Sequence, residues 1–203
     1  VGMDIICAQG TEGGGHTGET ATSVLIPQVV DLCRGKKSEL TGEQVLVVAA
    51  GGIFDSRGLA MALSLGASGV WVGTRFVCAE EAGAPPLHQK TVMNTTSEGT
   101  ARTIIFSGRP LRGGMTDYVR DWEDNRQEEI KDLTTKGILP AFHDQQKAEK
   151  EGNPLPLTTT RYWLMGQGAG AVNDVKPAKE IINEMIDGAI NIMRHNVSIV
   201  SRI

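Results

Sequence analysis

Three short apolar runs, each followed at once by glycine, constrain the fold of this chain more than any other feature. They occupy residues 3–8 (MDIICA), 45–50 (VLVVAA) and 69–72 (GVWV). Short runs that are apolar at almost every position are typical of parallel strands, because helices cover both faces of a parallel sheet. The sequence therefore predicts three buried parallel strands.

Two helical patterns separate these runs. Residues 24–32 (VLIPQVVDL) carry apolar side chains at helical spacing, and residues 59–65 (LAMALSL) are rich in helix formers. Asp55 and Ser56 are candidate N-caps of the second helix, and Gly66 is a suitable end for it. The order strand, glycine loop, helix is repeated, which predicts a βαβαβ unit with a parallel sheet.

The chain after residue 78 has a different character. Residues 99–114 are mixed and rich in loop formers, residues 117–136 are charged with helical character, and residues 145–152 suit a solvated helix end or loop. A second glycine cluster lies within residues 162–170 (YWLMGQGAG), where the stretch YWLM is expected to pack in a core. Asp174 is a candidate N-cap for a final amphipathic helix. The expected apolar side of that helix contains Ile181, Ile182, Met185, Ile186, Ala189, Ile190 and Met193.

Composition excludes several classes of protein. The net charge of −4 and the 22% charged residues do not favour a nucleic-acid partner, which would select a basic surface. No apolar run approaches the ~20 residues that span a bilayer, and no secretory signal is visible. Three widely spaced cysteines suit a reducing compartment and show no metal-ligand spacing. We therefore expect an intracellular, cytoplasmic protein without a membrane or metal partner.

The glycines that follow the strands lie where parallel α/β proteins bind ligands, at the carboxyl ends of the strands. The loops AAGGIFDSRG and GVWVGTRF both have backbone N–H groups to offer a phosphate, and loops after the last two strands of a (β/α)8 barrel often do so. Arg57 and Arg75 would add charge there; alternatively, each of them is a surface residue or a member of a structural ion pair. Alternatively, the glycines only permit tight turns and close packing.

The loop GTEGGGHTGE, residues 10–19, contains five glycines and one histidine. An imidazole titrates near neutrality and abstracts protons from carbon acids, and the glycines around His16 would let a flat ligand approach. The alternative is a solvated histidine without a role. Glu12 either orients this loop or binds backbone amides. His88, His143 and His195 we interpret as surface residues.

The segments AQGTEGGGHTGE, VVAAGGIFDSRGLAMALSLGASGVWVGTRF and GRPLRGG together resemble the nitronate monooxygenase family, formerly called 2-nitropropane dioxygenases. The segment GQGAG is similar to the C-terminal part of that family. The resemblance implies an FMN-dependent (β/α)8 barrel that oxidises alkyl nitronates with molecular oxygen, with neutral nitroalkanes as a further candidate substrate. It implies these small molecules as partners and leaves homo-oligomerisation open.

The resemblance also assigns roles to individual residues. It makes His16 the catalytic base or a substrate contact, while Gly13 departs from the Ala or Ser that the family more often has there. The remaining assignments concern the cofactor: Gly14 and Gly15 beside the flavin, its phosphate on the backbone of Gly51, Gly52, Gly73 and Thr74, and Gln167 near the flavin ring.

Length separates this chain from a complete barrel, which needs eight strands and typically ~250 residues. We expect residues 1–78 to form the last three βα units of the barrel, and residues 79–203 to form a mainly helical extension that packs on it. Because the chain opens without Met inside an expected strand, an upstream portion is expected. Two alternatives stay open: a flavin-dependent enoyl-acyl-carrier-protein reductase, and a catalytically silent fragment that binds a phosphate ligand.

Overall fold

The computed structural model describes residues 2–201 and contains a three-stranded parallel sheet. Its strands are β1 (Ile5–Gln9), β3 (Leu46–Ala50) and β4 (Gly69–Trp71), in the order β1-β3-β4. Cys7 of β1 lies opposite Val48 of β3, which in turn lies opposite Gly69 of β4. The prediction of three parallel strands is confirmed, and the fold class is α/β.

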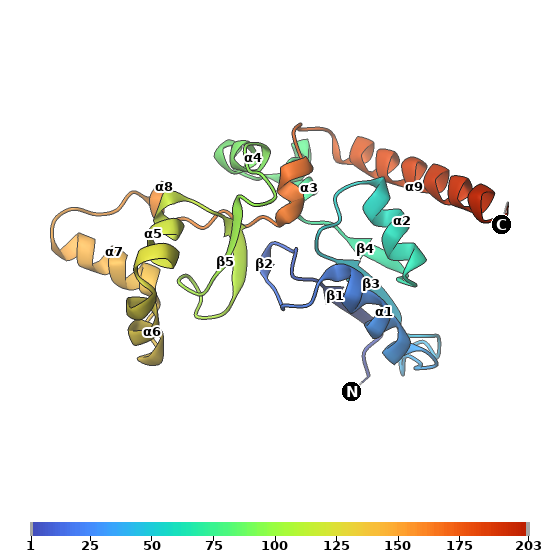
Figure 1. Ribbon diagram of the computed structural model, residues 1–203, viewed down its shortest axis with the longest axis horizontal. Coiled ribbons are helices and arrows are strands. Elements are labelled where there is room, and N and C mark those ends of the chain that lie inside the picture. The colour runs from blue at the N-terminus through green and yellow to red at the C-terminus, as the bar shows by residue number, and fades with distance from the viewer. Residues whose placement is uncertain (1, 202–203) are drawn as a thin grey trace.

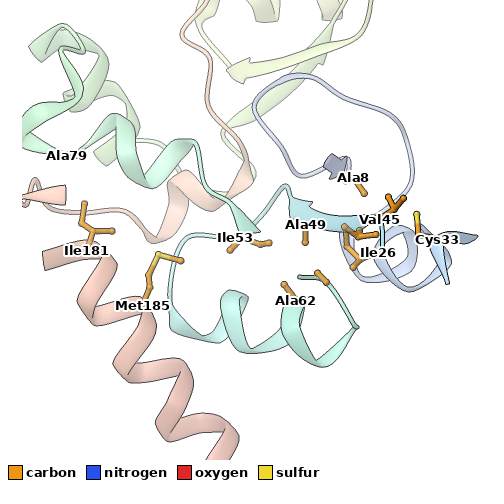
Figure 2. Packing of buried hydrophobic residues seen from close by; sticks show 12 residues of the cluster. Ala8, Ile26, Cys33, Val45, Ala49, Ile53, Ala62, Ala79, Ile181 and Met185 are labelled. Atoms are coloured by element: carbon orange, nitrogen blue, oxygen red, sulfur yellow. The ribbon is translucent and has the colours of Figure 1, made fainter. Parts of the chain in front are cut away.

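Three helices form the main core with this sheet: the first two lie against it, and the third packs on the second (Figure 1). They are α1 (Thr22–Cys33), α2 (Ser56–Ser64) and the long α9 (Ala178–Val200). Figure 2 shows side chains from all three helices gathered in one cluster with the strands. Asp55 caps α2 as expected, because its side chain accepts hydrogen bonds from the backbone N–H groups of Arg57 and Gly58.

The start of α9 differs from the prediction. Its N-cap is Pro177, and Asp174 lies three residues before that position. Asp174 instead forms an ion pair with Arg75 at 2.7 Å, because the Arg75 side chain is only 9% exposed and needs a counter-charge. Arg75 is therefore a member of a structural ion pair, which is one of the roles expected for it.

The apolar residues of α9 divide between two faces. Ile181, Met185 and Ala189 are buried against the rest of the core. The other four expected positions, Ile182, Ile186, Ile190 and Met193, are 40–46% exposed. The apolar surface of α9 is thus wider than the part that is buried by contacts within the described residues.

A second, antiparallel sheet contains the histidine of the glycine loop. It consists of β2 (Gly15–His16), β5 (Thr100–Thr103) and β6 (Leu111–Gly114), in the order β2-β6-β5. Residues 99–114, which we expected to be mixed and rich in loop formers, contain the two short strands β5 and β6 and the longer turn that joins them into a hairpin. Its strands are short and polar, and they are held by pairing with a segment far away in the sequence.

The charged stretch 117–136 forms two helices, α5 (Asp117–Asn125) and α6 (Gln127–Thr135), divided at Arg126. The Arg126 guanidinium lies 3.3 Å from the centre of the Trp122 ring and pairs with Glu129 and Asp144, so it holds the two helices and the next one together. The remaining helical segments are α3 (Thr74–Val77), η1 (Glu80–Ala82), α4 (Pro86–Met93), α7 (Pro140–Lys150), α8 (Leu157–Thr160) and η2 (Gln167–Ala171).

The elements lie along an elongated molecule (Figure 1). The parallel sheet with α1, α2 and α9 occupies one end, α5, α6 and α7 occupy the other, and the hairpin lies between them. Trp163 and Met165 are buried, as expected for the stretch YWLM, whereas Leu164 in the same stretch is 44% exposed. Within residues 2–201, no helix is both long and apolar enough to cross a bilayer.

Tyr118 makes the stability of the α5 cluster sensitive to alkaline pH. Burial raises the pKa of Tyr118 to about 12, whereas an unfolded tyrosine titrates near 10. The unfolded chain therefore loses this proton first, and the free energy of unfolding falls as pH rises from 10 towards 12. We expect Tyr118→Phe to reduce that slope by up to about 1.4 kcal/mol per pH unit. Urea denaturation at several pH values measures it, and an unchanged slope would contradict the assignment.

Candidate functional site

A cavity of about 230 Å³ lies at the carboxyl ends of the three parallel strands. Each strand contributes its last residue and the glycine loop that follows it, and the second glycine cluster closes the opposite wall. The lining residues are Gln9, Glu12, Gly13, Gly14, Gly15, Ala50, Gly51, Gly52, Ile53, Trp71, Gly73, Thr74, Val77, Leu164, Met165 and Gly168. Six of the seven predicted cofactor residues therefore line one cavity.

Four backbone amides in this cavity are free to bind a ligand. The N–H groups of Gly51, Gly52, Gly73 and Thr74 donate to no residue within the described part of the chain. Gly51 and Gly52 adopt φ values of +94° and +70°, which only glycine adopts readily. Successive unpaired amides that line a concave site are typical of anion binding.

Among the glycines that line the cavity, Gly73 is the one that neither a close contact nor a positive φ requires. Its φ is −100°, which any residue adopts, and a Cβ at this position would meet no atom within 4 Å. Gly14 is different, because a Cβ there would lie 2.7 Å from the backbone carbon of Met165. Packing within the chain thus explains Gly14, whereas the bare backbone at Gly73 leaves room for a ligand.

Gln167, the seventh predicted cofactor residue, does not line this cavity. Its backbone N–H donates to the carbonyl oxygen of Glu12 at 2.9 Å, and the residue lines an adjacent cavity that also contains Gly51 and Gly52. Thr74 contributes its side chain as well as its amide, since its Oγ1 accepts a hydrogen bond from the N–H of Gly166 at 2.8 Å. Both contacts join the C-terminal glycine cluster to the sheet loops.

His16 itself does not line the cavity; it follows Gly15, which does, in β2. The imidazole is exposed, and its Nε2 lies 3.0 Å from Oγ of Ser107. The side-chain amide of Gln9, which lines the cavity, donates to the backbone oxygen of His16 at 2.8 Å. His16, whose backbone is held by this contact, therefore lies one residue away from the lining of the cavity.

Comparison with models of known families identifies the family of this chain. The family model for nitronate monooxygenase matches residues 1–188 of this chain. The chain belongs to the nitronate monooxygenase family. A probable nitronate monooxygenase of Bacillus subtilis is 33% identical over 94% of this chain and 53% of its own length.

Two further similar proteins carry other names. A 5-hydroxy-7a-methyl-1-oxo-octahydro-1H-indene-4-carboxyl-CoA dehydrogenase of Mycobacterium tuberculosis is 42% identical, over 93% of this chain and 60% of its own length. The structure of FabK from Thermotoga maritima has a TM-score of 0.73 and 28% identity, and the match covers 97% of this chain and 58% of that one. The chain thus spans a little over half the length of these relatives.

In this member of the family, Glu12 binds backbone amides, one of the two roles expected for it. Its carboxylate accepts hydrogen bonds from the N–H of Thr22, at 2.9 and 3.1 Å, and so caps the first turn of α1. The Thr22 hydroxyl lies 2.8 Å from both Glu12 Oε2 and the carbonyl oxygen of Gly51. This chain of contacts connects the loops that follow β1 and β3.

Two arginines of the hairpin hold the ends of the histidine loop. Arg112 Nε donates to the carbonyl of Thr11 at 3.0 Å, and Arg102 Nη2 donates to the carbonyl of Thr17 at 3.3 Å. The two arginines lie directly opposite each other across β5 and β6. Burial, with the Arg102 charge, lowers the pKa of Arg112.

Sequence reasoning missed several residues of the site. Gln9, Trp71 and Leu164 line the cavity, and Trp71, the last residue of β4, is 68% exposed. A tryptophan at the carboxyl end of a strand was the available signal. The interpretation of His88 as a surface residue was wrong, because its Nε2 lies 3.0 Å from the Leu164 carbonyl and its ring contacts Trp163.

The structure also places the two remaining histidines and Arg57. His143 is half-buried with its Nδ1 inside the protein, so it is not a surface residue, whereas His195 is exposed. Arg57 is exposed and pairs with Asp55, and it does not line the cavity.

The Glu12 cap should contribute measurably to stability. We expect Glu12→Ala to lower the free energy of unfolding by about 1–2 kcal/mol, because the first turn of α1 loses its acceptor and its favourable charge. Glu19→Ala, an exposed position in the same loop, is the matched control, with an expected change below about 0.5 kcal/mol. Urea denaturation compares the two, and equal losses would contradict a capping role.

Proposed function

We propose that this chain is the FMN-binding and catalytic part of an enzyme that oxidises alkyl nitronates with molecular oxygen. The observation that carries the proposal is one cavity at the carboxyl ends of the parallel strands. It is lined by four residues whose backbone amides donate to no residue among those described, and by Gly15, the neighbour of His16 in β2. Membership of the nitronate monooxygenase family supports the substrate class. The proposed partners are a nitronate or nitroalkane and oxygen.

We further propose that β1, β3 and β4 are the last three strands of a (β/α)8 barrel. Consecutive strands are neighbours and their carboxyl-terminal loops form the cavity, as in such barrels. Large apolar residues on the strands, Ile5, Leu46 and Trp71, are 46–68% exposed, which suits further strands that would cover them. Residues 1–78 would then be the barrel part, and residues 79–203 the extension that packs on it.

The residues present fit the phosphate of FMN. The amides of Gly51, Gly52, Gly73 and Thr74 would hold it, and the bare backbone at Gly73 would admit it closely. When bound, FMN accepts electrons from the substrate and passes them to oxygen. Gly14, Gly15 and Gln167 would lie towards the rest of the flavin.

His16 would act on neutral nitroalkanes by removing the proton from the carbon that bears the nitro group. The imidazole must be unprotonated to do so, so turnover of the neutral substrate should rise with pH as the imidazole loses its proton. A nitronate has already lost that proton and needs no base.

Replacement of His16 separates these two substrates. We expect His16→Asn to lower kcat for a neutral nitroalkane by about 10²–10⁴-fold, the usual contribution of a general base, and to remove the rise with pH. Turnover of the corresponding nitronate should fall much less. Steady-state kinetics with oxygen consumption over a pH series measures both, and an unchanged nitroalkane profile would sink the assignment.

Replacement of Gly73 tests the cofactor site without touching the fold. The methyl group of Gly73→Ala enters open space where the phosphate would lie, so the Kd for FMN should rise about tenfold, or about 1.4 kcal/mol. Gly69→Ala is the matched control: a Cβ there also meets nothing, but Gly69 begins β4, at the other end from the cavity. Flavin fluorescence titration gives both values, and equal affinities would argue against this phosphate position.

A second candidate function is chemistry on a coenzyme A thioester. It is favoured by the 42% identity to the carboxyl-CoA dehydrogenase, which exceeds the 33% identity to the Bacillus subtilis relative. His16 would suit it too, because the α-proton of a thioester is also acidic. Anaerobic reduction of a crotonyl thioester by NAD(P)H, without turnover of nitronates, would favour this class, which includes the enoyl reductases. An absence of flavin binding and of both activities would favour the silent phosphate-binding fragment.

A further inference from the structure

The turn between β5 and β6 brings a serine hydroxyl to the imidazole of His16. Ser107 and His16 are 91 residues apart in sequence, yet Ser107 Oγ lies 3.0 Å from His16 Nε2. The same Oγ lies 3.0 Å from the carbonyl oxygen of Arg109 and 3.4 Å from the N–H of Arg109. Three polar groups therefore converge on one hydroxyl.

Counting protons decides how this group is arranged. A serine hydroxyl has one proton to donate and two lone pairs to accept with. If the proton goes to the Arg109 carbonyl, the lone pairs accept from the Arg109 N–H and from His16 Nε2–H, and all three contacts are hydrogen bonds. If the proton goes to His16 Nε2 instead, the Arg109 carbonyl loses this donor. The first arrangement satisfies more groups.

The backbone of His16 is held on both sides, which fixes the position from which the ring reaches this hydroxyl. His16 pairs with Leu111 across β2 and β6, and its carbonyl accepts from Gln9. The next residue, Thr17, donates to the carbonyl of Pro110 at 3.3 Å and accepts from Arg102. The hairpin therefore fixes both the main chain and one ring nitrogen of His16.

We infer that Ser107 is a positioning residue that holds neutral His16 with its proton on Nε2, which leaves the lone pair of Nδ1 to take the substrate proton. The tautomer follows from the hydrogen bonds of the hairpin alone. Only the use of Nδ1 as a base rests on the proposed function. On proton transfer, the bond from the substrate carbon to hydrogen breaks, its electron pair stays on the nitronate, and Nδ1–H forms on an imidazolium whose Nε2–H remains on Ser107.

Nitrogen NMR of the full-length, flavin-loaded enzyme reads the tautomer directly. Histidine is labelled with ¹⁵N, and long-range proton–nitrogen correlations are recorded at a pH where the imidazole is neutral; the His16 signal is the one that His16→Asn removes. We expect the pattern of an Nε2–H tautomer. An Nδ1–H pattern would overturn the inference, because Ser107 would then be the donor.

Substitution of Ser107 tests the positioning role. Ser107→Ala should let the His16 signal change towards a mixture of tautomers, and should lower kcat for a neutral nitroalkane by on the order of tenfold, with KM little changed. Ser107→Thr keeps a hydroxyl and should restore the wild-type spectrum and most of the rate. Turnover of the nitronate should fall much less than that of the nitroalkane in Ser107→Ala. A Ser107→Ala enzyme with an unaltered His16 spectrum and rate would overturn the inference.

The outcomes also distinguish failure of His16 as the base from failure of Ser107 as its positioning residue. If His16→Asn leaves nitroalkane turnover unchanged, the base assignment fails, whatever the tautomer. If His16→Asn abolishes that turnover while Ser107→Ala changes neither spectrum nor rate, His16 remains the base and the role of Ser107 fails. Should Ser107→Ala lower the urea stability, Ser107→Thr decides, because a merely structural role would not restore the ¹⁵N pattern together with the rate.

Discussion

The close backbone contact between the two glycine clusters is the constraint on which the site depends. A Cβ at Gly166 would lie 2.4 Å from the Glu12 carbonyl oxygen, and a Cβ at Gly14 would lie 2.7 Å from the Met165 backbone. Neither loop can therefore carry a side chain at the contact, and Gln167 N–H seals it with a hydrogen bond to Glu12. Because of this contact, the segment after α8 forms one wall of a cavity whose other wall is the end of the parallel sheet.

Three charged side chains make hydrogen bonds that hold the histidine loop, residues 10–19, in place. Glu12 caps α1, while Arg112 and Arg102 donate to loop carbonyls at Thr11 and Thr17. Two like charges opposite each other in a hairpin are unfavourable, and the carbonyl contacts offset this because those oxygens would otherwise lack partners at this rim. The loop is thus held from several elements, whereas the amides of Gly51 and Gly73 stay free for a ligand.

Several features could be predicted because their causes are local. The three strands follow from short apolar runs, and the cap at Asp55 follows from a carboxylate two residues before the amide that it binds. The placement of Gly51 and Gly73 at one sheet edge follows from parallel strands that end together. Asp174 was assigned a cap for the same local reason, and this was wrong because a buried arginine, Arg75, 99 residues away, is its partner instead.

By itself, the sequence determined the parallel βαβαβ order, the glycine loops at the strand ends and the resemblance to the nitronate monooxygenase family. Only the tertiary structure decided that residues 99–114 form a hairpin, that this hairpin pairs with His16, and that Ser107 meets its ring. The physical reason is the range of the interactions. Apolar periodicity and caps act over a few residues, whereas short polar strands are stable only through partners brought to them by the rest of the fold.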